Sequence, residues 1–252
     1  MPLHRGTKWL LAPGTLCTPR VFDPMLEYLA PDDRDRDFIT LDAPHVEDFH
    51  DRLQAQVTTE HIVCGFSLGS IMLAHNLDAL HNARAVVLVA CNPFADRMEN
   101  RTNREAIRDR VLAGDARGWV QDNWVSMAAN GSDALMDFVA TMAMESAPLI
   151  PNQTELAASR PGAVEALLES DVPLLFVTGS QDQLTPAAPL AAIVRDAKNA
   201  SLQVIERLGH FALIENPQRV AAAIRLGLAD LDKNPTLKRP KDAKTEYSRN
   251  TA

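Results

Sequence analysis

The most reactive arrangement in the sequence is a serine between two glycines, Gly65-Phe66-Ser67-Leu68-Gly69. An apolar run at 62–64 precedes it, and an apolar segment at 71–77, typical of a buried helix, follows it. On a sharp turn from strand to helix, a serine is held in a strained backbone conformation. The glycines leave out side chains that would collide with the neighbouring strand and helix. The pattern predicts that Ser67 presents its hydroxyl as a nucleophile.

A serine hydroxyl needs a base within hydrogen-bond reach and a carboxylate that orients this base. Asp182 follows the apolar segment 174–178, and His210 follows the segment 202–205. Alone, the first would be a turn residue and the second a loop residue. Both come, as Ser67 does, directly after a predicted strand, and sites in open α/β sheets lie at the carboxyl ends of the strands. We therefore expect the three side chains to meet at one edge of a sheet.

Strands and helices alternate along the chain. Residues 85–90 form a continuous apolar run without alternation, which indicates a parallel strand covered on both faces. Strand-helix-strand units with right-handed crossovers follow from this order. The expected strands are 8–12, 38–41, 62–66, 85–90, 173–178 and 201–205. The expected helices of this layer are 20–29, 46–57, 71–77 and one that begins near Pro217.

The region 92–170 lacks any comparable strand pattern. Its helical patterns are 103–112, 117–127, 133–144 and 153–168, the last broken near Pro161-Gly162. We interpret 92–170 as a helical lid inserted into a core that is formed by 1–91 and 171–233. Residues 234–252 contain very few apolar side chains, and we predict a disordered tail there.

Composition and charge exclude several classes of function. The formal net charge of −8 argues against a nucleic-acid-binding protein and weakly against binding to an anionic membrane. No apolar run reaches the ~18 residues of a membrane span. The apolar segment near the start is too short for a signal-peptide core, so a cytoplasmic protein is expected. The three cysteines have no metal-type spacing and are expected to be small buried apolar residues.

Together, the turn at Ser67 and the segments Gly179–Asp182 and Gly209-His210 resemble α/β-hydrolase-fold serine hydrolases over about residues 9–231. Within that superfamily, the segments 13–22 and 89–93 look most like the pimeloyl-ACP methyl ester carboxylesterase group and related small carboxylesterases. The resemblance implies a mostly parallel, doubly wound sheet of about six to eight strands. Two features depart from it. Pro13 replaces the usual loop histidine, and the segment before the first predicted strand is too short for the β-hairpin that usually leads the sheet.

By this resemblance, the backbone N–H groups of Thr15 and Leu68 form an oxyanion hole. Residue 68 opens a helix, so its amide also points at the site with the helix dipole behind it. The implied activity is cleavage of a small or acyl-chain ester through an acyl-enzyme, without metal or cofactor. The ester is either a free small molecule or a methyl ester carried on acyl carrier protein.

An acidic carrier protein would need a basic docking surface, which a cluster of arginines at the start of the lid could provide. A solvated helix face is the simpler explanation for this cluster. Its members are Arg101, Arg104, Arg108, Arg110 and Arg117.

Candidate pocket residues lie in the first loop, after the strand near residue 90, and in the lid. A stripe at helical spacing in the lid is more often explained by packing against the core, and Cys91 is more typical of the core itself. The candidates are Leu16, Cys91, Asn92, Trp124, Phe138 and Met142.

A serine nucleophile disfavours relatives that use an aspartate, and it leaves several functions open. An aminopeptidase, a thioesterase or a carbon–carbon bond hydrolase would use the same three residues. The aminopeptidase would also need carboxylates near the acyl site, for which Glu145, Glu155 and Glu165 are candidates. A different class is a ligand sensor that keeps the three residues but turns over slowly.

Overall fold

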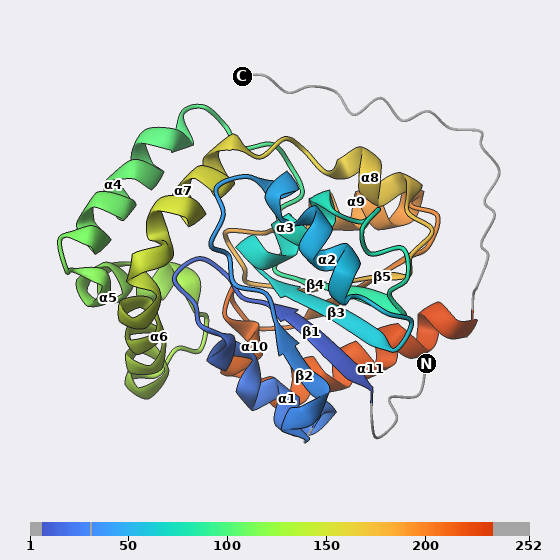
Figure 1. Cartoon of the computed structure of the whole chain (residues 1–252). Coiled ribbons are helices and arrows are strands. Elements are labelled where there is room, and N and C mark those ends of the chain that lie inside the picture. Colours follow the sequence, from blue (N-terminus) through green and yellow to red (C-terminus); the bar gives the residue numbers. More distant parts are fainter. Residues whose placement is uncertain (1–6, 31, 234–252) are drawn as a thin grey trace.

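The computed structural model describes residues 7–30 and 32–233, so the predicted tail at 234–252 lies outside the described residues. Six parallel strands form one sheet in the order β2-β1-β3-β4-β5-β6 (Figure 1). This confirms the predicted fold class at the lower end of its strand range. The strands are β1 (Lys8–Ala12), β2 (Arg36–Phe38), β3 (His61–Phe66), β4 (Ala85–Val89), β5 (Leu174–Gly179) and β6 (Ala200–Ile205).

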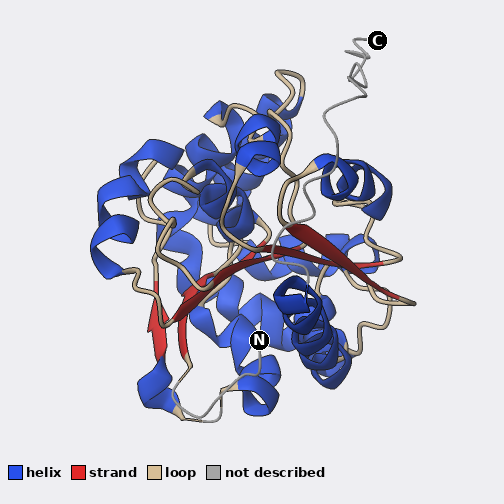
Figure 2. Cartoon of the chain, turned by 90° about the vertical axis from the view of Figure 1, so that its right-hand side faces the viewer, coloured by secondary structure: helices blue, strands red, loops and turns tan. Residues whose placement is uncertain are grey.

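Helices cover both faces of the sheet (Figure 2). One face carries α1 (Asp23–Leu29) and α11 (Pro217–Lys233), and the other carries α2 (His50–Gln56), α3 (Leu68–His75) and α9 (Ala187–Asp196). In β4, Val87 and Val89 belong to the first apolar layer, whereas Val86 and Leu88 belong to the second. The continuous apolar run of this strand therefore reflects burial on both sides. The short helices are η1 (Pro19–Phe22), η2 (Asp33–Asp35), η3 (Val46–Phe49), η4 (Ala147–Leu149) and α10 (Ala212–Glu215).

The strand predicted at 38–41 is displaced: β2 spans Arg36–Phe38 and lies at the edge of the sheet. Ile39 and Leu41, whose apolar character suggested the strand, are buried beyond its end. The N–H of Ile39 still donates to the carbonyl of Leu11, at 2.9 Å, before the chain leaves the sheet. The apolar pattern at 39–41 therefore marks burial in an apolar layer of the sheet and not a longer strand.

The order of the strands places a crevice between β1 and β3. After β1 the chain crosses to the edge strand β2 by way of α1, and after β3 it turns the other way to β4 by way of α3. Since the two connections leave in opposite directions, the carboxyl ends of β1 and β3 border a gap where ligands of open α/β sheets bind. The loop at 13–18 and Ser67 both lie at this gap.

The segment between β4 and β5 forms a group of helices at one end of the molecule (Figure 1). They are α4 (Asn100–Leu112), α5 (Ala116–Met127), α6 (Asp133–Ser146) and α7 (Ile150–Ser159). The helical pattern at 153–168 forms two helices, with the break near Pro161-Gly162 that the sequence predicts. The second, α8 (Val164–Glu169), packs beside α3 and α9 with Leu167 in the apolar layer of the sheet. No helix of the described residues is long and apolar enough to cross a membrane.

Gly179, at the end of β5, allows the loop that carries His210 to lie against the strand. A Cβ at this position would be 2.1 Å from the carbonyl oxygen of Leu208. Backbone atoms cannot give way cheaply, so we predict that Gly179→Ala lowers the free energy of unfolding by about 3 kcal/mol. Urea unfolding measures this. At the control position Gly162 the nearest atom is 3.3 Å away, and equal losses in the two variants would contradict the prediction.

Candidate active site

Ser67 occupies the strained turn that the sequence predicts. Its φ is +50° and its ψ is −114°, a conformation that non-glycine residues rarely adopt. Added Cβ atoms at Gly65 and Gly69 would approach the Ser70 nitrogen to 2.5 Å and the Ala12 carbonyl oxygen to 2.0 Å. The N–H of Ser67 donates to the carbonyl of Val89 at 2.9 Å. Close backbone packing against β1, β4 and α3 therefore holds the strained turn in place.

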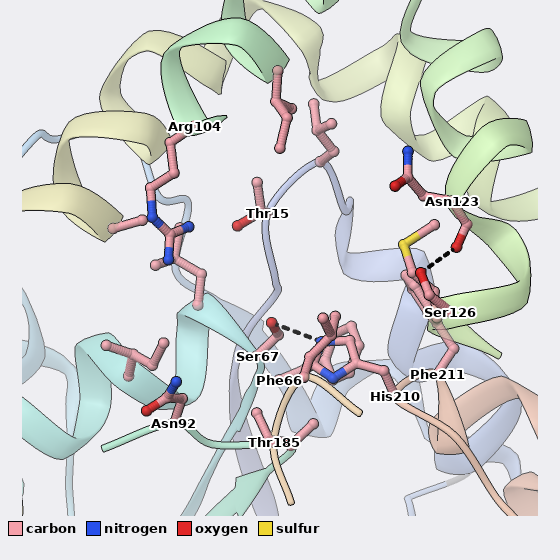
Figure 3. A pocket seen from close by; sticks show the side chains of 18 of the residues that line it. Thr15, Phe66, Ser67, Asn92, Arg104, Asn123, Ser126, Thr185, His210 and Phe211 are labelled. Atoms are coloured by element: carbon pink, nitrogen blue, oxygen red, sulfur yellow. Dashed lines mark hydrogen bonds between the residues drawn. The ribbon is translucent and has the colours of Figure 1, made fainter. Parts of the chain in front are cut away.

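His210 joins Ser67 to Asp182. Its Nε2 lies 2.9 Å from the Ser67 Oγ, and its Nδ1 lies 2.9 Å from Asp182 Oδ2; Figure 3 shows the contact between Ser67 and His210. With the ring proton on Nδ1, the imidazole donates to the carboxylate and accepts the serine proton at Nε2. The structure thus brings together the three predicted side chains, from loops after β3, β5 and β6.

Asp182 is buried, and several donors surround its carboxylate. Oδ1 accepts the N–H groups of Leu184 and Thr185, both at 2.9 Å, and Oδ2 accepts the Thr185 hydroxyl as well as the His210 ring. Burial raises the pKa of Asp182, but the hydrogen bond and charge of His210 and the bonds from Thr185 outweigh it. The net effect lowers the pKa below its ordinary value. The group is therefore a carboxylate at neutral pH.

Thr15 and Leu68 line the same cavity as Ser67 and His210. Leu68 is the first residue of α3, so its N–H has no acceptor within the helix. The loop that carries Thr15 is held from the lid: the N–H of Leu16 donates to Gln153 Oε1 at 3.0 Å. Leu16 itself has a φ of +55°. The sequence analysis missed Gln153, a buried polar residue on α7.

A second contact between lid and core holds the loop of His210. The Glu215 carboxylate accepts the N–H groups of Gly209, Ala129 and Asn130 at 3.0–3.1 Å. The N–H of His210 donates to the Met127 carbonyl at 2.9 Å. These bonds connect the loop between α5 and α6 to the loop after β6. They therefore fix the backbone that carries the His210 imidazole.

The cavity over Ser67 has a volume of about 420 Å³ and is lined by loop ends of the sheet and by the lid. Two of the predicted pocket residues, Leu16 and Asn92, line it, together with Ser67 and His210. The lid contributes residues from four helices. They are Asn100, Asn103, Arg104 and Ile107 from α4, Trp119, Val120, Asn123, Ser126 and Met127 from α5, Val139 and Ala143 from α6, and Ala157 from α7.

Four predicted pocket residues do not line the cavity: Cys91, Trp124, Phe138 and Met142. Trp124 and Met142 are buried in the apolar cluster behind the pocket wall. Phe138 lies under the Arg20 guanidinium, 5.2 Å from ring centre to Cζ. Cys91 packs in the layer on the other face of the sheet, where burial raises the pKa of its thiol to about 12. Each helix turns a neighbouring stripe toward the cavity, which a helical pattern alone does not reveal.

Comparison with known proteins agrees with this architecture. The model of the alpha/beta hydrolase family matches residues 9–223. The chain belongs to the alpha/beta hydrolase family. The family model covers the six strands from residue 9 on, the turn at Ser67, the lid and the loops of Asp182 and His210. The search for curated relatives by sequence found no match.

Several solved structures share the fold of this alpha/beta hydrolase. A thermophilic esterase from Thermogutta terrifontis, solved with malate bound, is 18% identical, with coverage of 90% and 91% of the two chains and a TM-score of 0.73. MenH from S. aureus is 15% identical, with 92% and 97% covered and a TM-score of 0.74. A bromoperoxidase from Bacillus anthracis is 16% identical, with 90% and 94% covered and a TM-score of 0.71. Identities this low show the shared fold alone.

The lowered pKa of Asp182 predicts a pH-dependent contribution to stability. Because the unfolded carboxylate binds its proton more tightly than the folded one, the contribution is complete above the ordinary value of 3.8 and is lost as the pH falls through the folded pKa. Asp182→Asn should therefore have a lower free energy of unfolding than wild type near neutral pH. The difference between the two proteins should become smaller below pH 3.8. Urea unfolding across this range measures it. Asp51→Asn, at a 99% exposed carboxylate, is the control, and a gap constant with pH would refute the prediction.

Proposed function

We propose that the protein is a serine carboxylesterase that acts on small-molecule esters. The proposal is supported chiefly by the two contacts of His210, 2.9 Å to the Ser67 hydroxyl and 2.9 Å to the Asp182 carboxylate. A neutral imidazole in this position removes the serine proton as the hydroxyl attacks an acyl carbonyl, and the buried carboxylate stabilises the imidazolium that forms. Esterases among the structural neighbours agree with this chemistry.

The remaining steps use groups that already border the cavity. The N–H groups of Leu68 and Thr15 stabilise the negative oxygen of the tetrahedral intermediate, helped by the positive end of α3. The imidazolium of His210 then protonates the departing alcohol, which leaves an acyl-enzyme on Ser67. Water, deprotonated by the same imidazole, attacks the acyl carbonyl; the bond to the Ser67 Oγ breaks, and the imidazolium returns the proton to that oxygen as the acid leaves.

The charges around the cavity disfavour an aminopeptidase. Of the residues that the structure places in its lining, Asp96 alone is acidic, and Arg104 occupies its carboxylate. Glu145 instead pairs with Arg20, and Glu155 with Arg101. Glu165 is also outside the lining. A free amine on the substrate would therefore find no available carboxylate there.

The arginines at the start of the lid give little support to a carrier-protein partner. Each pairs with a carboxylate of this chain: Arg101 with Glu105 and Glu155, Arg104 with Asp96, Arg108 with Asp109, Arg110 with Asp115 and Asp122, and Arg117 with Asp137. Exposed pairs like these reduce the free positive charge that an acidic partner would meet. We therefore favour a free small ester over one linked to acyl carrier protein. The likeness to the pimeloyl-ACP methyl ester carboxylesterase group and the cytoplasmic location stay predictions from the sequence.

Replacement of the nucleophile tests the proposal directly. Ser67→Ala removes the attacking oxygen, so we expect kcat/KM for p-nitrophenyl acetate to fall by at least about 10⁴-fold. The matched control is Ser70→Ala, since the Ser70 hydroxyl is buried and donates to the Val89 carbonyl at 2.8 Å. Turnover that survives in Ser67→Ala would contradict the assignment, and ligand binding without turnover in the wild type would favour a sensor.

The contact of Gln153 with the loop of Thr15 predicts a positioning effect. Gln153→Leu leaves the N–H of Leu16 without its acceptor, so the loop shifts and the Thr15 amide leaves its position; we expect kcat to fall about 10- to 100-fold with a smaller change in KM. The control is Asn152→Leu, whose side chain bonds to the Asp42 carbonyl on the exposed side of α7. Equal kcat values in the two variants would show that the loop does not depend on Gln153.

A further inference from the structure

We propose that the ester substrate carries a second, anionic group, a carboxylate, and that Arg104 binds it inside the cavity. The inference rests on the proposed esterase function and specifies the substrate class. Arg104 projects from α4 into the cavity, on the side that carries Asn92 (Figure 3). The substrate predicted by this arrangement is a half-ester of a small dicarboxylic acid, with the ester at Ser67 and the free acid at Arg104.

The guanidinium of Arg104 is fixed in place, and its Nη1 is still able to donate to a ligand. Its Nε and Nη2 donate to the two oxygens of Asp96, at 2.5 and 2.9 Å. Within the described part of the chain, no acceptor is recorded for its Nη1, and 30% of the side chain is exposed. The side chain of Asp96 is only 3% exposed. The buried carboxylate therefore holds the guanidinium rigidly, so that little side-chain entropy is lost when a ligand binds.

Positive charge exceeds negative charge at this wall. Arg160 lies on the other side of Asp96, with its Nη2 3.4 Å from Oδ1 and a side chain that is 2% exposed. Its other nitrogens donate to the carbonyls of Phe94 and Ala157. Two guanidiniums thus share one carboxylate, and this wall carries one uncompensated positive charge. In a partly apolar cavity, a ligand carboxylate would be attracted to this charge more strongly than in water.

Asp96 cannot serve a cationic ligand in this arrangement. Its oxygens accept from Arg104 and from the Asn100 amide, at 3.1 Å, and face Arg160. Burial raises the pKa of Asp96, but the bonds from Arg104 and Asn100 outweigh this effect and lower it, so that the group remains ionised beside both arginines. Asn92 and, on α4, Asn100 and Asn103 also line the cavity and add polar groups to it. A volume of about 420 Å³ has room for a small acid ester.

The test compares monomethyl with dimethyl esters of the C4 to C7 straight-chain dicarboxylic acids, and p-nitrophenyl acetate serves as a neutral reference. Wild type should prefer at least one monomethyl ester, by kcat/KM, over its dimethyl ester. In Arg104→Gln, we expect the ratio of kcat/KM for the monomethyl over the dimethyl ester to fall about 10- to 100-fold. The neutral reference and fluorophosphonate labelling show that this variant is folded and has its nucleophile.

Asp96→Asn is the matched variant that separates binding from structure. It breaks the same ion pair but keeps the guanidinium, so the preference for the monomethyl ester should fall much less than in Arg104→Gln. Arg101→Gln on the same helix, at an arginine outside the cavity lining, controls for the charge of α4 and should keep the preference for the monomethyl ester.

If Asp96→Asn and Arg104→Gln lose the preference equally, the pair is structural and the inference is wrong. It is also wrong if wild type hydrolyses the dimethyl esters as well as the monomethyl esters. Absence of turnover on every ester, the neutral reference included, would instead overturn the esterase proposal itself.

Discussion

The hydrogen bond between Ser67 and His210 joins residues 143 positions apart in the chain, and most of the architecture serves to make it possible. Ser67 lies at the carboxyl end of β3, where the backbone is tightly packed. A side chain at Gly65 or Gly69 would collide with neighbouring backbone and displace the turn. The histidine has to reach the same point from the end of β6, three strands away in the sheet. Close backbone approaches at Gly69 and Gly179 bring the two loops within reach of each other.

The lid stabilises the site as well as covering it. Gln153 from α7 holds the loop after β1. The Met127 carbonyl accepts the N–H of His210 directly. The amides of Ala129 and Asn130 hold the same loop through the Glu215 carboxylate. The loop after β1 and the loop of His210 are therefore both bonded to the lid. This attachment limits the movement that the strained backbone at Leu16 would otherwise favour.

Much of the core and the meeting of Ser67, Asp182 and His210 could be predicted from the sequence, because parallel strands end at one edge and apolar runs mark the strands. The lid was less predictable. Its helices appear near the expected positions, but a periodic pattern does not say which stripe faces the cavity. Trp124 and Met142 are buried in the apolar cluster, whereas Trp119 and Ala143 line the cavity. Arg104 looked like one member of a charged helix face. Only the packing of α4 shows that it reaches the cavity.

The site of covalent modification by a fluorophosphonate tests the central claim most directly. The purified protein would be treated with a small fluorophosphonate, digested, and analysed by mass spectrometry. The structure predicts a single adduct on Ser67, formed faster than on any other serine, because His210 activates that hydroxyl alone among the described residues. Adducts spread over several hydroxyl groups, or none on Ser67, would contradict the account.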